Sequence, residues 1–179
     1  MKLKADLSGG SWGLPRARAV ARQVETSPTA VRQLITILFG EEVELRKRAA
    51  DAARRITERD PSPLAPYADE LAGLLAELPL DEQRTRWHLG LVVPRIAATH
   101  EQRLRAARLM LALSHPEGNG NVVRCSAVEG IALLASQEPS LRELAGEMID
   151  RALQTGSKAE RSRAHAAEKL LRGRAKKSG

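Results

Sequence analysis

The amino-acid sequence predicts an all-α fold built as an array of helix pairs. Apolar residues recur at helical spacing along most of the chain, and no segment alternates with period two for long enough to form a sheet. Aromatic residues make up only 2% of the 179 residues, too few for a β-sandwich, a barrel or a base-stacking RNA-binding module. With 42% apolar residues the chain can still bury a core. We therefore expect eight or nine helices.

A first set of helices is indicated by apolar stripes and by their start signals. The stripes cover residues 31–38, 71–78, 104–111 and 141–152. Ser27 before Pro28 fits an N-cap. Three further segments have capping-box spacing: Thr99 to Gln102, Ser140 to Glu143 and Ser157 to Glu160. Proline- and glycine-rich breaks at 60–63, 78–79, 115–121 and 154–156 separate the helices.

A second set of helices shares one repeated pattern and alternates with the first. Five segments align on a common arginine, followed three and six positions later by small or apolar residues. The shared residues are Arg18, Arg46, Arg86, Arg124 and Arg161, at spacings of 28, 40, 38 and 37 residues. One unit is therefore a helix pair of about 38 residues, the period expected of an α-solenoid.

The repeated pattern resembles the second helix of HEAT repeats. Its best copies are LRKRAADAA at 45–53 and VRCSAVEGI at 123–131, and the resemblance covers roughly residues 15–172. The resemblance implies about four antiparallel helix pairs stacked into a right-handed α-solenoid, with the second helices lining its concave face. It also implies a scaffold or adaptor role, because HEAT arrays are rarely enzymes.

The chain divides into three parts. Residues 1–14 form a leader that is either flexible or docks through Trp12 as an N-terminal cap, residues 15–172 form the repeat domain, and residues 173–179 form a basic flexible tail. Residues 156–179 hold eight Lys/Arg and two Glu, which is +6 of the net charge of +7. No signal peptide or membrane span is predicted, and the single cysteine, Cys125, excludes an internal disulfide. We expect a cytoplasmic protein without a membrane partner.

Trp87 is the most prominent candidate for binding a partner. In the register of the repeats, Trp87 and Leu91 lie on the helix side opposite the core, so we expect an exposed pair in the concave groove, as in a binding hot spot. The cations expected around this pair are Arg84, Arg86, Arg46, Arg48 and Arg124. Two alternatives stay open. The repeated arginines form a structural ladder between neighbouring repeats, or Trp87 is tucked between helices.

We therefore expect a non-catalytic module or scaffold that binds a segment of another protein. The alternative is nucleic-acid binding through the groove arginines and the basic residues Arg161, Arg163, Arg172, Arg174, Lys176 and Lys177. A HEAT-like DNA glycosylase is a variant of that alternative, although no motif places a catalytic aspartate. A third possibility is an array that associates with itself to hold other components together. No catalytic residue, metal, cofactor or small-molecule substrate is predicted, because the histidines and the cysteine lack ligand spacing.

Overall fold

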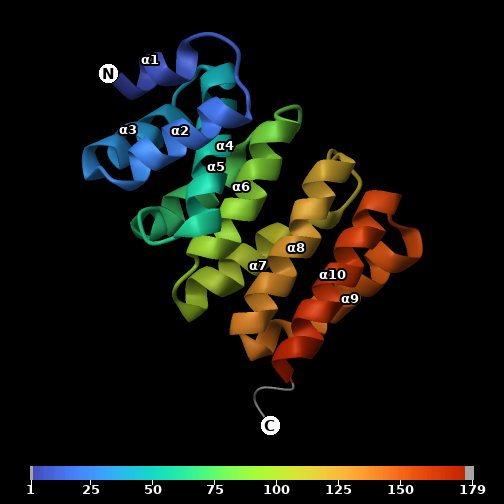
Figure 1. The fold of residues 1–179 in the computed structure, drawn as a ribbon. Coiled ribbons are helices and arrows are strands. Elements are labelled where there is room, and N and C mark those ends of the chain that lie inside the picture. Colours follow the sequence, from blue (N-terminus) through green and yellow to red (C-terminus); the bar gives the residue numbers. More distant parts are fainter. Residues whose placement is uncertain (1, 176–179) are drawn as a thin grey trace.

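The structure, a computed structural model, describes residues 2–175 (Figure 1). This part of the chain forms ten α-helices and two short 3₁₀ helices and contains no strand. The α-helices are α1 Lys2–Ser8, α2 Leu14–Glu25, α3 Pro28–Leu38, α4 Val43–Arg59, α5 Ala68–Glu77, α6 Gln83–Ile96, α7 His100–Ser114, α8 Asn121–Gln137, α9 Arg142–Thr155 and α10 Lys158–Ala175; the 3₁₀ helices are η1 Ala65–Tyr67 and η2 Pro139–Leu141. The all-α prediction is confirmed.

From α2 onward the helices alternate between two rows. Helices α2, α4, α6, α8 and α10 form one row, in which each helix packs against the next. Helices α3, α5, α7 and α9 each pack against helices of that row. Figure 1 shows the first row crossing the molecule from its blue to its red end. We call it the arginine row, because its five helices are those that carry the repeated arginine.

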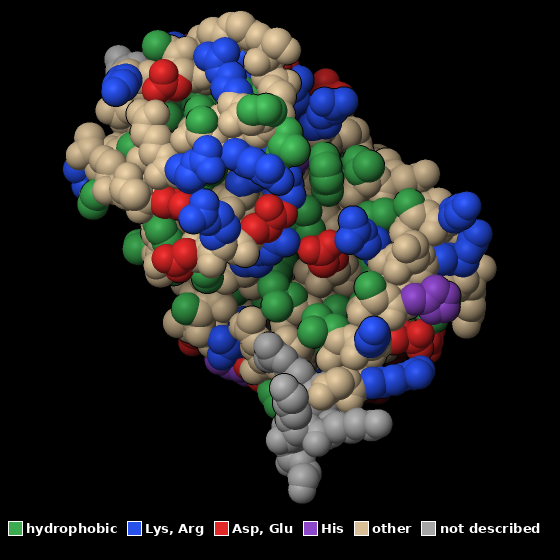
Figure 2. Space-filling model, in the orientation of Figure 1, with side chains coloured by type: hydrophobic (Ala, Val, Ile, Leu, Met, Phe, Trp, Pro, Cys, Tyr) green, Lys and Arg blue, Asp and Glu red, His purple; other side chains and the backbone are tan. Residues whose placement is uncertain are grey.

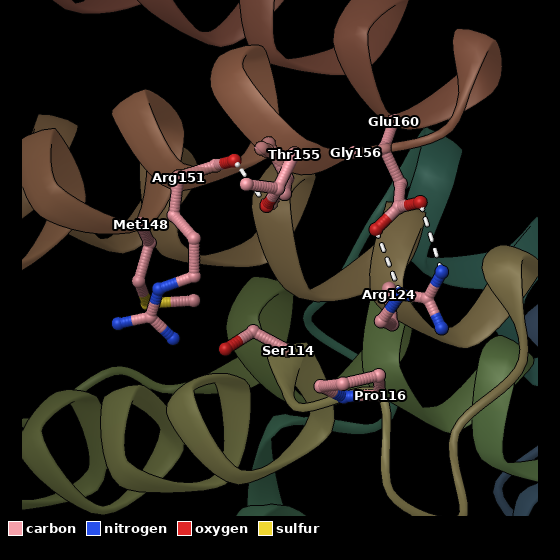
Figure 3. Close-up of a pocket in the computed structure, with 10 residues that line it drawn as sticks. Ser114, Pro116, Arg124, Met148, Arg151, Thr155, Gly156 and Glu160 are labelled. Carbon is pink, nitrogen blue, oxygen red and sulfur yellow. Dashed lines mark hydrogen bonds and ion pairs between the residues drawn. The ribbon is translucent and has the colours of Figure 1, made fainter.

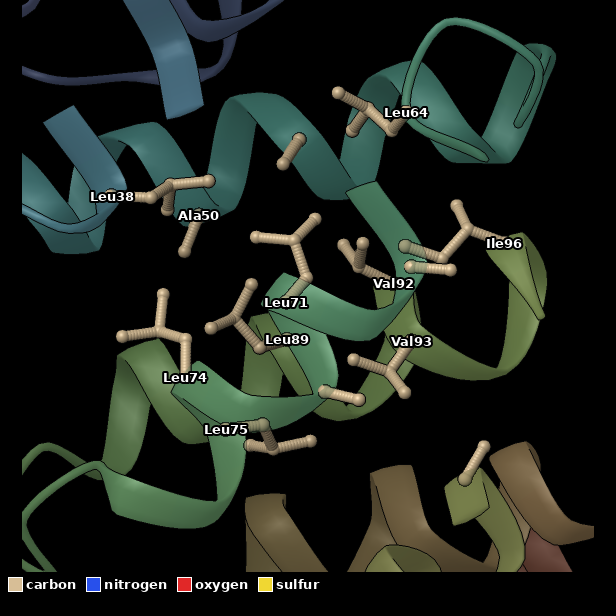
Figure 4. Close-up of a cluster of buried hydrophobic side chains, with 14 of the residues drawn as sticks. Leu38, Ala50, Leu64, Leu71, Leu74, Leu75, Leu89, Val92, Val93 and Ile96 are labelled. Atoms are coloured by element: carbon tan, nitrogen blue, oxygen red, sulfur yellow. The ribbon is translucent and has the colours of Figure 1, made fainter. Parts of the chain in front are cut away.

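The core lies between the two rows and continues through most of the molecule. Figure 4 shows its middle section, where leucine side chains of α5 meet the apolar side chains of α6. Helices α6 and α8 approach each other closely because small residues lie between them. A Cβ atom at Gly90 would lie 2.5 Å from Oγ of Ser126, and one at Gly130 would lie 2.8 Å from Cγ of Pro94. As a result, α6 is enclosed on almost all sides.

Most of the expected helix starts have the predicted caps. The hydroxyl of Ser27 accepts a hydrogen bond from the amide of Ala30, and Thr99 forms the predicted capping box at the start of α7. Ser157 forms the same arrangement at the start of α10. The capping box predicted at Ser140 is wrong, because η2 precedes α9 there and the Ser140 hydroxyl donates to Glu138 instead.

Residues 2–14 pack onto the repeats. Leu3 and Leu7 of α1 are buried, and α1 contacts α3 and α4. Nε1 of Trp12 donates to Oδ2 of Asp51 at 3.1 Å. These contacts hold α1 and Trp12 against α3 and α4. At the other end α10 continues to Ala175, past the expected start of the tail, and residues 176–179 lie outside the described part of the chain.

Candidate functional site

The repeated arginines join successive helices of the arginine row. Arg46 on α4 donates from Nε to Oε2 of Glu82 at 3.1 Å, and its Nη2 forms an ion pair with Oε1 of the same carboxylate at 3.0 Å. Arg124 on α8 makes the same two-point contact with Glu160, at 2.8 and 3.0 Å. Glu82 is the N-cap residue of α6, and Glu160 lies in the first turn of α10. Each arginine therefore binds the start of the next helix, and we call these contacts the arginine ladder.

Arg86 forms the middle rung of the arginine ladder with neutral acceptors. Its Nη2 donates to Oδ1 of Asn119 and its Nη1 to the backbone carbonyl of Leu78, both at 2.9 Å. Only 6% of Arg86 is exposed, because α6 is enclosed between α4 and α8. The expectation that Arg86 lines an exposed binding surface is therefore wrong. Arg46 and Arg124 are half-buried and engaged within the chain, as the structural alternative expected.

The arginine ladder is open at both ends. Glu42, the N-cap residue of α4, pairs with Lys4 of α1 and not with the repeated arginine of α2, Arg18. Arg18 is exposed and has no polar partner among the described residues. Arg161 on α10 donates to the backbone carbonyl of Gly156 at 2.5 Å, but no side chain of the described residues accepts from it. Its guanidinium is the last one of the arginine ladder within residues 2–175.

Trp87 and Leu91 do not form the predicted exposed pair. Trp87 is half-buried on α6, whereas Leu91, one turn later, is only 7% exposed. The prediction is wrong for Leu91, because α4 and α8 flank α6 closely. Their side chains cover most of Leu91. The Trp87 ring stacks on that of His88 with centroids 4.4 Å apart. The guanidinium carbon of Arg54 lies 5.8 Å from the Trp87 ring centre.

A groove crosses α4, α6, α8 and α10 at Trp87 and has a volume of about 290 Å³. We call it the Trp87 groove. Its floor includes Trp87 and Leu91, and α8 contributes Cys125, a half-buried thiol whose pKa is raised by burial. Charged side chains stand along it: Arg54 and Glu58 from α4, Glu129 from α8 and Arg163 from α10. The groove is therefore apolar below and charged at its sides.

The charges beside the Trp87 groove are balanced. Arg54 pairs with Glu58 and, at 3.2 Å, with Asp51. Glu129 lies 3.2 Å from Nη2 of Arg95 and 3.5 Å from Nη1 of Arg163. Among the residues that line the groove, two arginines, Arg54 and Arg163, thus stand with two carboxylates, Glu58 and Glu129. Figure 2 shows basic and acidic side chains interspersed over the arginine row, with hydrophobic side chains between them.

A buried polar centre lies behind the Trp87 groove. Burial raises the pKa of Asp51, but the charges of His88 and Arg55 and the hydrogen bonds from Trp12 and Arg54 together hold that pKa below its ordinary value. Burial lowers the pKa of His88 to about 4, so this histidine is neutral at neutral pH. The arginines and Trp12 therefore keep Asp51 ionised. With both carboxylate oxygens engaged, Asp51 has a structural role.

The other predicted residues are spread over several surfaces. Arg84 is exposed on α6 and has no hydrogen-bond or ion-pair partner within residues 2–175. Arg48 points to the N-terminal segment, where it donates to the carbonyl of Leu7 at 2.7 Å and lies over the Trp12 ring. The cations of the nucleic-acid alternative fall on α10 or beyond it: Arg161, Arg163 and Arg172 are exposed, the side chain of Arg174 is not described, and Lys176 and Lys177 lie outside the described residues.

A second cavity, of about 240 Å³, lies between the α7–α8 turn, α9 and α10. Figure 3 shows the Arg124–Glu160 pair at one side of it and Arg151 at the other. The hydrogen bond from Arg124 is the main reason that the pKa of Glu160 falls to about 2. Both charges of this pair are committed to each other, so the cavity offers only Arg151 as a free charged group.

The sequence did not single out the acidic side of the Trp87 groove. Glu58 and Glu129 lie on different repeats, and each follows the common arginine at a different distance. Only the packing of α4, α6 and α8 brings them to one groove. Glu58 pairs with an arginine four positions away, and Glu129 pairs with an arginine on the preceding helix of the row. Such pairs are also typical of a solvated helix face, so they did not indicate a groove.

None of the described helices is both long enough and apolar enough to span a membrane. Within residues 2–175 no group of three or more His, Cys, Asp or Glu side chains is placed to hold a metal ion. Comparisons with protein-family models, with curated proteins and with solved structures found no match.

Proposed function

We propose that this chain is a non-catalytic, cytoplasmic binding module that holds an extended segment of another protein in the Trp87 groove. We further propose that the two rows of helices form a HEAT-like, right-handed α-solenoid. The ladder contacts support the repeat, because they join residues 36, 33 and 36 positions apart, close to the predicted period. A concave groove along one row is the surface that such arrays offer to partners.

The observation that carries the proposal is the half-buried Trp87 on the floor of a groove with charged sides. Tryptophan is enriched where a few residues provide most of the binding energy, because it buries a large apolar area and loses little conformational entropy. Arg54 and Glu129 stand at the sides of the groove, where a peptide backbone or side chain can exchange hydrogen bonds with them. A segment with one apolar anchor and polar neighbours of both signs fits this arrangement.

The charge balance favours a protein segment over a phosphate backbone. Nucleic-acid binding depends on unpaired cations that release counterions from phosphates. Arg54, Arg95 and Arg163 each have a carboxylate partner already, so a phosphate would have to compete with Glu58 and Glu129 and would be repelled by them. A mixed-charge peptide meets both signs without this penalty.

A peptide selection tests the proposal. Peptides selected from a displayed random library against the wild-type chain would be titrated by fluorescence anisotropy into wild type, Trp87→Ala and the control Phe39→Ala. Phe39 is 49% exposed and lies after α3, so it reports on unspecific contact with an aromatic surface. We expect Trp87→Ala to lower affinity about tenfold or more, and Phe39→Ala to leave it unchanged. An affinity within a factor of two for folded Trp87→Ala would contradict the proposal.

Nucleic-acid binding is the second candidate, and the unpaired cations favour it. Arg84 on α6 and Lys158 and Lys169 on α10 have no hydrogen-bond or ion-pair partner among the described residues. Duplex DNA and single-stranded RNA would be titrated at about 50 and 200 mM salt, because each neutralised phosphate steepens the salt dependence by a slope of about −0.9 on duplex DNA. Strong, salt-sensitive binding that is lost in Arg84→Gln would make this the leading function.

A further inference from the structure

Two stripes of opposite charge lie on the last two described helices. The basic stripe runs along α10 and the acidic stripe along α9. The basic stripe is Lys158, Arg161, His165, Lys169 and Arg172, and the acidic stripe is Glu143, Glu147 and Asp150; all eight residues are exposed. Within each stripe the residues are three or four positions apart, which places them on one side of the helix. Figure 2 shows Lys, Arg and His side chains gathered along the α10 side of the molecule.

The basic stripe occupies the position at which the arginine row would continue. In α8, the residues four and eight positions after the common arginine are Val128 and Ala132, which are buried and pack in one cluster with Ala164 of α10. The equivalent residues of α10 are His165 and Lys169, and both are exposed. Arg161, the unfilled last rung of the ladder, lies on the same side. This face of α10 is thus a helix-packing face whose apolar residues are replaced by cations.

The acidic stripe has no partner within the described residues, whereas the basic stripe is partly paired: His165 and Arg172 lie 3.5 and 3.0 Å from the carboxylate of Glu168 on the same helix. Glu143, Glu147 and Asp150 form no ion pair with any described residue, and neither does Lys169. Helices α9 and α10 pack against each other as an antiparallel pair joined by a short turn, yet their stripes do not meet. The acidic stripe and Lys169 are therefore free to pair with another molecule.

We propose that this face binds a second copy of the chain in a two-fold dimer. A two-fold axis parallel to the helices, between α9 and α10, places α10 of one copy against α9 of its partner. The two helices then run antiparallel. Lys169 lies opposite Glu143 of the partner copy, His165 lies opposite Glu147, and Arg161 lies opposite Asp150. Because the contact occurs twice, every ion pair is formed in duplicate. The inference does not depend on the Trp87 groove.

The charge distribution disfavours the other occupants. In a head-to-tail array the basic stripe would meet the N-terminal repeat, but residues 1–40 hold six Lys/Arg against two acidic residues, so like charges would face each other. A nucleic-acid backbone would be attracted to α10 and repelled by the acidic stripe next to it. The whole face is matched only by a partner that places an acidic stripe against α10 and a basic stripe against α9. A second copy of the chain carries both stripes.

The dimer should be weak and sensitive to salt. Two helix faces bury less than the roughly 800 Å² per partner of a standard interface, and exposed ion pairs contribute little individually. We expect a dissociation constant on the order of 100 μM at low salt, with dissociation at high salt as screening increases.

Charge reversal tests the proposal by sedimentation equilibrium of the full chain at low and high salt. Glu143→Lys and Lys169→Glu change two residues that lie opposite each other in the proposed dimer. Each would place like charges together, and the combined variant would restore opposite charges. The controls are Glu77→Lys on α5 and Arg108→Glu on α7, which make the same charge changes at exposed positions elsewhere. We expect each single reversal on the stripes to weaken dimerisation about tenfold, the combined variant to recover it, and the controls to have no effect.

Several outcomes would overturn the proposal. A monomer at low salt up to millimolar concentration excludes the dimer. A mass that grows beyond two copies indicates head-to-tail association instead. A combined variant that stays monomeric shows that the stripes do not face each other. If the chain is monomeric and Lys169→Glu abolishes binding to duplex DNA, the basic stripe is a nucleic-acid surface.

Discussion

Arg124 and Glu160 meet in a two-point ion pair, with Nε–Oε1 and Nη2–Oε2 distances of 2.8 and 3.0 Å, although they lie 36 residues apart. The pair joins α8 to the first turn of α10, where Oε2 of Glu160 also accepts the backbone amide of Ser157. One carboxylate therefore caps its own helix and holds the preceding helix of the row. The same arrangement between Arg46 and Glu82 makes this contact a repeated element of the fold.

Removing the arginine of this pair should destabilise the fold. In Arg124→Met the carboxylate of Glu160, a residue that is 5% exposed, would keep its burial and lose its main partner. We expect a loss of about 2–3 kcal/mol in the free energy of unfolding, measured by urea titration. Arg151→Met is the matched control, because Arg151 lines the same cavity, is exposed and has no ion pair within residues 2–175. Equal unfolding midpoints for the two variants would contradict the ladder's structural role.

The contribution of Glu160 should disappear in acid. Its pKa in the folded chain is about 2, below the ordinary value of 4.5, so folding favours the ionised form. The stabilisation is complete above pH 4.5 and is lost as the pH falls through about 2. Urea midpoints of wild type and Glu160→Gln, measured at intervals from pH 5 downward, should converge toward pH 2. A constant difference between the two chains over this range would show that the carboxylate charge is unimportant.

His88 should make the fold sensitive to a different pH range. Burial lowers its pKa from 6.5 to about 4, and the neighbouring Arg54 and Arg55 act in the same direction while Asp51 opposes them. The unfolded chain takes up the proton first, so stability should fall as the pH drops from 6.5 to 4, by roughly 2–3 kcal/mol. His88→Leu lacks this titration and should lose less stability over the same range. Parallel stability curves for the two chains would refute the assignment.

Close packing around Gly130 should make its substitution by alanine destabilising. A Cβ atom there would lie 2.5 Å from Sδ of Met110 and 2.8 Å from the Pro94 ring. Gly130→Ala should therefore destabilise the fold by about 1–2 kcal/mol, because overpacking outweighs the gain in helix propensity. Gly73→Ala on α5, where nothing lies within 4 Å, should instead stabilise the fold by about 0.5–1 kcal/mol. Thermal unfolding of both variants measures the contrast, and the same sign for both would contradict the packing.

The sequence predicted the secondary structure better than the surface. Apolar periodicity and local caps such as Ser27 and Thr99 act within one helix, so they can be recognised from neighbouring residues. The burial of Leu91 could not be predicted in this way. The helical period placed it beside Trp87 on the side opposite the core, but its exposure depends on how closely α4 and α8 approach.

The sequence by itself determined the all-α fold, the alternation of two helix sets and the arginine that recurs at about 38-residue spacing. Only the tertiary structure decided what each arginine contacts. Arg46 and Arg124 meet carboxylates, Arg86 meets an amide and Arg161 has no side-chain partner, because each acceptor comes from the following unit. Local sequence sets the face on which a side chain lies. The separation of the helices, fixed by small residues such as Gly90 and Gly130, decides whether that face is buried, paired or open.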